Sequence, residues 1–296
     1  MEQEHIPVQL NEVMDYLQVD PALFYIDCTA GLGGHLGEIA RRLVTGFVIG
    51  NDRDGESLEK AKQNTLQWAD RIRYHQGRFS ELRRALVANG LKQVNGLLAD
   101  LGVSRYQLTD PERGFSLQAE GPLDMRTNRT EGITAGEIVN YTAEKALADL
   151  IYQLGEERRA RRIARAIVRA RPVRSTLHLA RIVESAVPRT GRIHPATQTF
   201  MALRIAVNEE VEELEALMKL APELVAPGGR IVVLTFMSSE DRVVKQAFQR
   251  LAREGRARIL TKHVVKPAYE EVVQNPASRS SKLRCVEILG APREQG

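Results

Sequence analysis

The chain has 296 residues, of which 43% are hydrophobic and 27% charged, and a formal net charge of +4. This length and apolar content suffice for a large core in one elaborated domain or two smaller ones. No apolar run reaches membrane-spanning length and the first residues do not resemble a leader, so we expect a soluble, cytoplasmic protein. Cys28 and Cys285 lie in separate apolar runs without metal-ligand spacing, so we expect buried thiols and no metal site.

Strand-like and helix-like runs alternate over the first hundred residues. The pattern predicts strands at 24–27, 46–52, 72–77 and 94–102, with a helix after each of the first three. This alternation is typical of a parallel sheet with helices on both faces. The next stretch, residues 103–132, is rich in Gly, Pro, Asp and Arg and lacks periodicity, which predicts a long ordered loop.

Helical patterns follow at 134–154, 156–170 and 176–187. The alternation then resumes with a helix within 207–225, a strand at 230–236, a helix at 240–254, and strand-like runs at 257–266 and 282–289. Two consecutive strand-like runs predict a final antiparallel pair on an otherwise parallel sheet. We therefore predict an α/β domain of residues 1–107 and 206–296, interrupted by a mostly helical inserted domain of residues 108–205.

A glycine-rich turn, "DCTAGLGGH" at residues 27–35, connects the first strand to the first helix of the sheet. Gly31, Gly33 and Gly34 would let a ligand lie against the backbone at the carboxyl edge of a parallel sheet. Leu36 stands where the dinucleotide fingerprint requires its third glycine, which argues against NAD. Asp52, at the end of the second strand, is placed to accept hydrogen bonds from a ribose. The pattern indicates a nucleoside-containing cofactor, although an ordinary structural turn has the same composition.

Positive charge concentrates in one segment. Residues 151–205 contain 12 arginines, no lysines and 3 glutamates, a formal +9, which leaves −5 for the rest of the chain. Within it, four arginines recur at helical spacing opposite an apolar face; these are Arg158, Arg162, Arg165 and Arg169, with Ile163, Ala164, Ile167 and Val168 on the other side. Such a stripe is commonly a solvated face, but the scarcity of acidic partners favours contact with RNA phosphates.

Several motifs together resemble the MraW family of bacterial methyltransferases that act on the small ribosomal subunit. The matching stretches include "DCTAGLGGH", "GNDRD", "GRFSEL", "DPERGFS", "GPLDMR", "HPATQTFMALRIAVNEE" and "NPASRSSKLRCVEI", and they span nearly the whole chain in order. The resemblance implies a Rossmann-like class I fold and S-adenosylmethionine (SAM) as cofactor. It also implies methylation of the N4 amino group of a cytosine in the decoding centre of 16S rRNA.

The resemblance carries seven cofactor contacts onto this sequence. They fall in the glycine turn, at strand ends or just after them, and are Gly33, Gly34, His35, Asp52, Phe79, Asp100 and Gln107. Each has a simpler structural alternative, such as a helix-turn position for His35, a core position for Phe79 or a turn cap for Asp100. Taken together they favour a cofactor site. The "DPERGFS" and "GPLDMR" segments, with Arg113 and Arg126, predict either a lid on the substrate side or a structural bridge.

The catalytic residue is not defined by the sequence. Many amino-methyltransferases have an Asp/Asn-Pro-Pro-aromatic motif after the fourth strand, whereas this chain has Asp100 followed by Leu-Gly-Val. Asp100 could accept a hydrogen bond from the target amine or serve only the cofactor. Met237 and Ser239 replace a histidine and a leucine usual in the family, and Arg105 also departs from its pattern. We expect Met237 and Arg105 at strand ends that could face the substrate.

Two other functions stay open at this stage. A nucleotide-dependent oxidoreductase is disfavoured by Leu36 and by the terminal strand pair. A non-catalytic or substrate-shifted RNA-binding relative is suggested by the missing motif and by Met237. The expected partner is 16S rRNA or the small ribosomal subunit, with no membrane involvement; a homodimer stays open.

Overall fold

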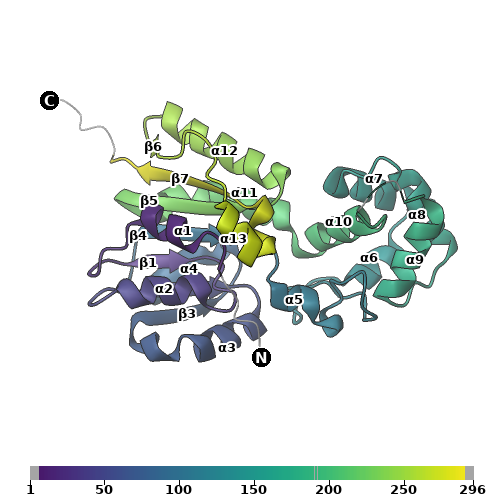
Figure 1. The fold of residues 1–296 in the computed structure, drawn as a ribbon, viewed down its shortest axis with the longest axis horizontal. Coiled ribbons are helices and arrows are strands. Elements are labelled where there is room, and N and C mark those ends of the chain that lie inside the picture. The colour runs from purple at the N-terminus through teal and green to yellow at the C-terminus, as the bar shows by residue number, and fades with distance from the viewer. Residues whose placement is uncertain (1–6, 190, 192, 291–296) are drawn as a thin grey trace. The chain divides into compact units, whose positions relative to one another are not determined.

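The structure is a computed structural model that describes residues 7–189, 191 and 193–290 (Figure 1). It divides into two compact units. The first contains residues 1–102 and 212–296, and the second contains residues 103–211. The boundaries predicted from sequence, at 107 and 206, lie within a few residues of these divisions. The predicted assignment of the inserted segment to RNA recognition stays a prediction.

The first unit is built on a seven-stranded sheet in the order β3-β2-β1-β4-β5-β7-β6. The strands are β1 (Tyr25–Asp27), β2 (Val48–Asp52), β3 (Ile72–Gln76), β4 (Val94–Asp100), β5 (Val225–Thr235), β6 (Ala257–Ile259) and β7 (Lys282–Ile288). Strands β1 to β5 pair in parallel, and β7 pairs antiparallel with both β5 and β6. The predicted Rossmann-like sheet with one antiparallel strand near the C-terminus is confirmed.

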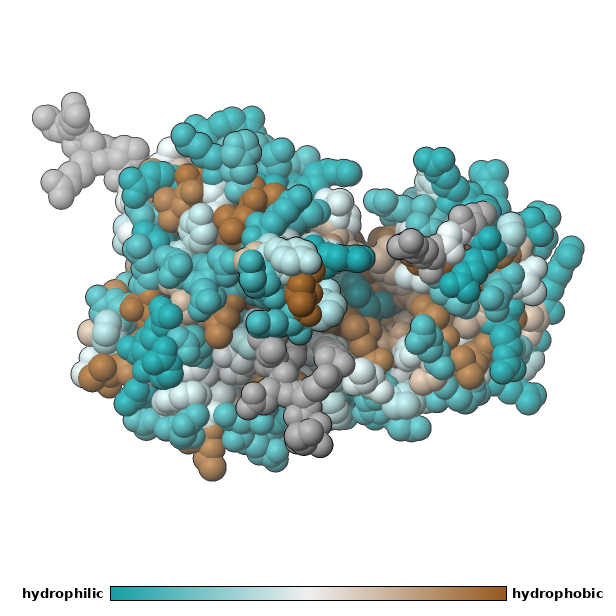
Figure 2. All heavy atoms as spheres, viewed as in Figure 1, coloured by the Kyte–Doolittle hydropathy of each residue, from teal (hydrophilic) through white to brown (hydrophobic). Residues whose placement is uncertain are grey.

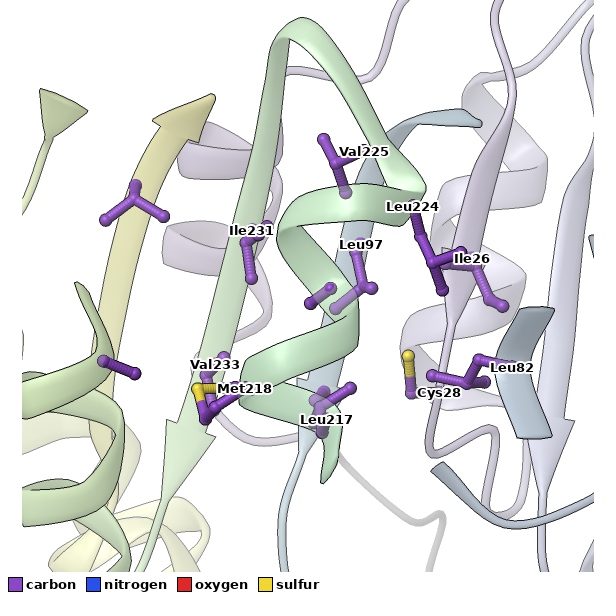
Figure 3. Close-up of a cluster of buried hydrophobic side chains, with 14 of the residues drawn as sticks. Ile26, Cys28, Leu82, Leu97, Leu217, Met218, Leu224, Val225, Ile231 and Val233 are labelled. Atoms are coloured by element: carbon purple, nitrogen blue, oxygen red, sulfur yellow. The ribbon is translucent and has the colours of Figure 1, made fainter. Parts of the chain in front are cut away.

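The first unit contains seven helices among the described residues, most of which cover the sheet with an apolar face. They are α1 (Leu10–Leu17), α2 (Gly34–Arg42), α3 (Gly55–Asn64), α4 (Leu82–Ala88), α11 (Glu210–Leu224), α12 (Ser238–Arg253) and α13 (Tyr269–Gln274), with short 3-10 turns η1 (Leu66–Arg71), η2 (Phe79–Glu81) and η4 (Pro276–Ser280). On one face, Leu217 and Met218 of α11 pack over Leu97 of β4 and Ile231 and Val233 of β5 (Figure 3). Burying these side chains stabilises the unit by roughly 1.5–3 kcal/mol for each large one.

Parallel pairing brings polar strand ends to one edge of this sheet. Asp27 ends β1 and pairs in register with Gly50 and Leu98, while Asp52 and Asp100 end β2 and β4. The residues before them are fully buried and mostly apolar, so the chain becomes polar where each strand leaves the core. The carboxyl edge therefore collects three carboxyl groups, at the place where open α/β sheets bind ligands.

The second unit is mostly helical. It contains α5 (Arg105–Thr109), α6 (Ala135–Tyr141), α7 (Glu144–Gly155), α8 (Ala160–Arg169), α9 (Thr176–Ala186), α10 (Thr197–Asn208) and the 3-10 turn η3 (Pro111–Arg113). Ile163 and Ile167 of α8 are fully buried with Leu147 of α7 and Leu179 of α9 in one core.

Some local predictions need correction. Residues 134–154 form two helices, because Thr142 and Ala143 adopt extended dihedral angles between α6 and α7. The predicted loop 103–132 contains α5 and η3. Arg105 is not at a strand end: β4 stops at Asp100, and Arg105 opens α5. In the expected run 257–266, strand β6 covers only its first three residues, and Val265 adds an isolated bridge to Leu283.

The visible surface is mixed in hydropathy, and both cysteines are buried. Hydrophobic residues on the visible face are scattered in small groups among hydrophilic ones (Figure 2). Within the described ranges, no helix is both long and apolar enough to cross a membrane. Cys28 and Cys285 are buried free thiols, as predicted.

Candidate functional site

In the turn after β1, Gly31 has open space where a side chain would be. Gly31 has φ +51°, a left-handed conformation that favours glycine, and a Cβ added there would meet only the Thr29 carbonyl oxygen, at 3.7 Å. Its N–H donates to Asp52 Oδ2 at 2.8 Å, which connects this turn to the end of β2. Gly31 is therefore the position in the turn where another molecule can approach the backbone closely.

The neighbouring glycines also serve the packing of the chain itself. Gly33 has φ +92°, and a Cβ there would lie 2.8 Å from Thr65 Cγ2. A Cβ on Gly34 would lie 3.1 Å from Pro7 Cβ. Packing within the chain is enough to explain why glycine stands at both positions. The predicted cofactor contacts of Gly33 and Gly34 therefore stay predictions.

Thr29 links the ends of β1 and β4 across the sheet edge. Its hydroxyl accepts a hydrogen bond from the Asp100 N–H at 2.7 Å and donates to Asp27 Oδ1 at 3.3 Å. The Thr29 N–H donates to the same Asp27 oxygen at 3.0 Å. One hydroxyl thus connects the Asp27 carboxyl group to the backbone of Asp100 on the adjacent strand.

The carboxyl groups of Asp27 and Asp100 each have one oxygen atom that forms no hydrogen bond with a described residue. Asp27 Oδ2 and Asp100 Oδ1 are buried and have no hydrogen-bond partner among the described residues. Burial raises the pKa of Asp100 to about 8, with added repulsion from Asp27 and Glu240. Burial also raises the pKa of Asp27 to about 7, although the hydrogen bonds from Thr29 act the other way. Such oxygens suit a cationic or N–H-donating ligand, which would favour their ionised form.

Asp52 and Phe79 lie on the other side of the turn. Asp52 Oδ1 accepts from the Asp54 N–H at 2.9 Å, and its carbonyl accepts from the Gly77 N–H at 3.0 Å. Burial raises the pKa of Asp52 to about 6. Phe79 opens η2 just after β3, half-buried against the core. The structure thus places Asp52 at the end of β2 and Phe79 just beyond the end of the adjacent strand β3, and their predicted roles toward ribose and adenine stay predictions.

His35 lies in the first turn of α2, next to Asp100. Only 6% of it is exposed, its Nε2–H donates to the Val8 carbonyl at 2.9 Å, and its Nδ1 is 3.7 Å from Asp100 Oδ2. The Val8 carbonyl can only accept a hydrogen bond, so Nε2 carries a proton. His35 is thus buried beside Asp100, and its predicted contact with the cofactor stays a prediction.

Met237 follows β5 at the same sheet edge, as expected. It is half-buried at the N-cap of α12, where Glu240 Oε2 accepts from the N–H groups of Phe236 and Met237, both at 3.0 Å. These bonds hold the 8% exposed Glu240 carboxylate where it raises the pKa of Asp100.

Gln107 and Arg105 belong to the second unit. Gln107 is 5% exposed in α5, and its Oε1 accepts from the Ser104 N–H at 2.8 Å while Ser104 Oγ accepts from the Gln107 N–H at 3.2 Å. This reciprocal pair is a capping box. The predicted contact of Gln107 with the cofactor stays a prediction.

The arginines of the "DPERGFS" and "GPLDMR" segments have structural partners. Arg113 is 1% exposed and donates to the carbonyls of Arg126, at 3.3 Å, and Thr127, at 2.8 Å. Arg126 forms a two-pronged ion pair with Asp124 at 2.7 and 3.0 Å. These contacts all lie within the second unit, so the lid and the structural bridge both stay predictions.

The arginine stripe is exposed as predicted. Arg158, Arg162, Arg165 and Arg169 are all exposed, whereas Ile163, Ala164 and Ile167 are buried and Val168 is partly buried. Arg158 lies before α8, whose helix begins at Ala160. Only Arg165 of the four pairs with a described carboxylate, Glu144 at 3.4 Å. The unpaired guanidinium groups leave a basic surface on the second unit.

Sequence reasoning missed Asp27 and Thr29 as site residues. Asp27 is 1% exposed, and its acidic side chain directly ends an apolar strand before the glycine turn. That position was a usable signal, since a buried carboxyl at a strand end needs a partner. The role of Thr29 depends on the pairing of β1 with β4, which are separated by about seventy residues, and no local pattern reveals it.

The sheet order, its single antiparallel strand and the acidic carboxyl edge define a Rossmann-like fold of the methyltransferase class. The chain belongs to the MraW methylase family, whose model matches residues 2–289. This membership confirms the predicted family.

Curated relatives cover nearly all of the chain. The ribosomal RNA small subunit methyltransferase H of Solibacter usitatus is 61% identical over 96% of this chain and 99% of its own length. The protein of the same name from Acidobacterium capsulatum is 48% identical, over 97% and 99%. The solved structure of a putative rRNA-methylase from Clostridium thermocellum is 12% identical, covers 96% of this chain and 98% of its own, and has a TM-score of 0.48.

The residues present fit the cofactor of this class, S-adenosylmethionine. The unpartnered oxygens of Asp27 and Asp100 would hold its ammonium group, and Gly31 would give its chain access to the turn. Asp52 ends β2, the position from which an acidic side chain reaches ribose hydroxyls.

Proposed function

We propose that this protein is a SAM-dependent methyltransferase that methylates the exocyclic N4 amino group of a cytosine in the decoding centre of 16S rRNA. The observation that carries the proposal is the 61% identity, over almost the full length of both chains, to a relative named for the small-subunit ribosomal RNA. The unpartnered carboxyl oxygens at the ends of β1 and β4 support it from the chain's own geometry. A ribosomal RNA substrate implies a cytoplasmic enzyme.

The chemistry demands little covalent work from the protein. When bound, the cofactor supplies a sulfonium-activated methyl group: the S–C bond breaks with its electron pair on sulfur, an N–C bond forms, and the amine then releases a proton. The chain would have to hold the amine close to that methyl group, which is mainly a task of positioning. A carboxylate aimed at the amino hydrogens would stabilise the positive charge that develops on nitrogen.

Asp100 has two candidate roles in that scheme. Its buried Oδ1 and its Oδ2 beside His35 point to different surroundings, so one carboxyl group could hold the cofactor and also accept from the target amine. Asp27 is more deeply buried, and we assign it to the cofactor alone. Asp100→Asn and Asp27→Asn distinguish these roles. Loss of turnover at saturating cofactor in Asp100→Asn indicates contact with the amine, whereas weaker cofactor binding alone indicates a cofactor role.

The basic segment of the second unit is the proposed binding surface for the RNA substrate. A target base must be unstacked to reach a pocket at a sheet edge, so we propose a single-stranded or loop nucleotide of 16S rRNA. Exposed arginines of and near α8 would bind the phosphates of that RNA. We assign RNA recognition to the inserted helical unit.

A second candidate is a non-catalytic or substrate-shifted RNA-binding relative. Met237, where the family usually has histidine, lies half-buried just after β5 at the edge that carries Asp100. A thioether neither donates nor accepts strongly, so this position lacks the hydrogen bonds that an imidazole would offer.

The test is methyl transfer from labelled SAM into small-subunit particles that lack the modification, followed by nucleoside analysis. We expect N4-methylcytidine from the wild-type protein, a large loss with Asp52→Ala, and normal activity with the exposed control Asp15→Asn. A product other than N4-methylcytidine identifies a shifted substrate. SAM and RNA binding without any transfer, to naked RNA or particles, identifies the non-catalytic alternative.

A further inference from the structure

The second unit contains a cavity outside the predicted cofactor site, between α7 and the start of α8. Its volume is about 240 Å³, and its lining comprises Ala148, Asp149, Tyr152, Arg158, Ala160 and Arg161. Ala148 and Ala160 are 5% and 2% exposed, and their small side chains leave the space that larger residues would fill. This volume is below the range of pockets for drug-sized ligands, so it suits a single ring system with its immediate substituents.

Tyr152 offers an aromatic wall to this cavity. It is 60% exposed on α7, and it has no hydrogen bond or ring contact within the part of the chain that the structure describes. An aromatic side chain left in water beside a cavity gains by stacking on a planar ligand. Stacking of a nucleic-acid base on such a ring contributes about 1–3 kcal/mol.

The charged residues of the cavity are also available to a ligand. Arg158 and Arg161 are exposed, and neither pairs with a carboxylate among the described residues. Arg159, which lies between them in the sequence, is engaged instead with Glu157 at 3.3 Å and with the Pro188 carbonyl at 3.2 Å. Arg159 is therefore held by other parts of the chain, whereas the guanidinium groups of Arg158 and Arg161 lie at the cavity. Two free guanidinium groups match the charge and fork geometry of a phosphodiester.

Asp149 restricts the chemical class of ligand that this cavity can bind. It is the one carboxylate in the lining, it is exposed, and no described residue donates to it. A wholly anionic ligand, such as an acidic peptide, would meet repulsion from Asp149. A base with an exocyclic amino group would donate to it, and carboxylates accept well from such groups.

We propose that this cavity is an auxiliary nucleotide site that takes one unstacked, amino-bearing base of single-stranded RNA. The base stacks on Tyr152, its amino edge donates to Asp149, and the adjoining phosphate contacts Arg158 and Arg161. The inference rests on the proposed function in requiring an RNA substrate. It adds a second point of attachment, which fixes the register of the RNA on the helical unit independently of the target base.

The test measures binding of a short, fluorescein-labelled single-stranded RNA of alternating cytidine and adenosine to the full chain by anisotropy. We expect Tyr152→Ala to raise the dissociation constant about 5-fold to 150-fold, the range that follows from the stacking energy. Tyr152→Phe keeps the stacking ring and should stay within about twofold of wild type. Tyr141→Ala is the matched control, because Tyr141 is 83% exposed in the same unit and does not line the cavity.

A second measurement uses the wild-type protein and so does not depend on the folding of a variant. The same RNA carrying photoreactive 8-azidoadenosine in place of one adenosine, which keeps the exocyclic amino group, should cross-link to the peptide that contains Tyr152. Unchanged affinity in Tyr152→Ala, an equal loss in Tyr141→Ala, or cross-links confined to other peptides would overturn the proposal. Displacement of the RNA by poly-glutamate as readily as by unlabelled RNA would also overturn it, by showing an unspecific basic surface.

The methyl-transfer assay separates this proposal from the proposed function. Wild-type transfer to small-subunit particles together with unchanged RNA binding by Tyr152→Ala refutes only the auxiliary site. Absence of RNA binding by the wild-type protein overturns the auxiliary site, and the proposed function is then judged by methyl transfer alone. Tyr152→Ala should leave SAM affinity within about twofold of wild type, since no residue of the cavity lies in the first unit.

Discussion

Asp100→Asn should make the stability of the cofactor-free protein less dependent on pH. The folded-state pKa of Asp100 is about 8, well above the value near 4 of an aspartate in an unfolded chain. Between these values the folded state holds a proton that the unfolded state has released. The favourable contribution of this group is therefore complete below about pH 4 and is lost as the pH rises through about 8.

The magnitude follows from the linkage between protons and folding. One such proton lowers the free energy of unfolding by about 1.4 kcal/mol for each pH unit gained between pH 5 and 7. Asparagine has the same shape but does not titrate, so this slope should disappear for that site. The stability of Asp100→Asn relative to wild type should then increase by about 2.7 kcal/mol over those two pH units.

The chain offers a convenient probe for this measurement. Its single tryptophan, Trp68, lies in the first unit and packs beside Gly37 of α2. Urea unfolding followed by tryptophan fluorescence at several pH values therefore reports on the unit that contains Asp100. The control is Asp15→Asn, an exposed aspartate of α1 in the same unit.

Parallel pH dependence in wild type and Asp100→Asn would refute the reasoning, because it would mean that Asp100 is already ionised in the folded protein at pH 5. Saturating SAM supplies an independent check. A cationic ligand favours the ionised carboxyl group, so the wild-type slope between pH 5 and 7 should become shallower with SAM, and the Asp100→Asn slope should change less.

Three further outcomes are expected. Gly33→Ala should destabilise the first unit by about 2–3 kcal/mol in the fluorescence assay, more than Gly90→Ala, because both have positive φ but only Gly33 lacks room for a Cβ; equal effects would contradict the steric argument. Asn208→Ala should lower the free energy of unfolding of the protein by about 2–4 kcal/mol in thermal unfolding followed by circular dichroism, because the 4% exposed amide bonds four polar groups of the helical unit. A decrease below about 0.5 kcal/mol would contradict this expectation. Arg162→Gln with Arg169→Gln should weaken RNA binding and reduce the slope of log affinity against log salt by about 0.7 for each phosphate that these two arginines neutralise; an unchanged slope would indicate a solvated face.

The central strands β1, β2 and β4 were predictable because they are nearly uniform in burial. Every residue of β4 from Gly96 to Ala99 is buried, and Asp100 marks the strand end by a change from apolar to acidic. A strand that is covered on both faces has a continuous apolar sequence, and this pattern can be recognised without knowing which strands lie beside it. The final antiparallel pair was predicted from two apolar runs with no helix expected between them. The pair is present, but the short helix α13 and the turn η4 lie between β6 and β7, so that part of the expectation was wrong.

Features that depend on distant partners were not predictable. Gly33 looks like a ligand-binding glycine in sequence, and its missing Cβ proves to accommodate Thr65, a residue more than thirty positions away. Arg113 looks like a substrate contact, yet it is 1% exposed and bonded to the Thr127 carbonyl. The break at Thr142 has no glycine or proline to announce it. Composition identifies which residues can do chemistry, and packing decides which of them face outward.

The acidic edge of the sheet is best explained by a ligand. Asp27 and Asp100 each retain a buried oxygen without a hydrogen bond among the described residues, and burial next to other carboxyl groups raises the pKa of both. In a chain selected for stability alone, asparagine or an apolar residue at either position would remove this cost. Thr29 nevertheless donates to one oxygen of Asp27 and accepts from the Asp100 N–H, which fixes the two strand ends and leaves those two buried oxygens without a hydrogen bond among the described residues. The arrangement is unfavourable in the free protein and becomes favourable when a cation or a set of N–H donors arrives, which is the property of a preformed binding site.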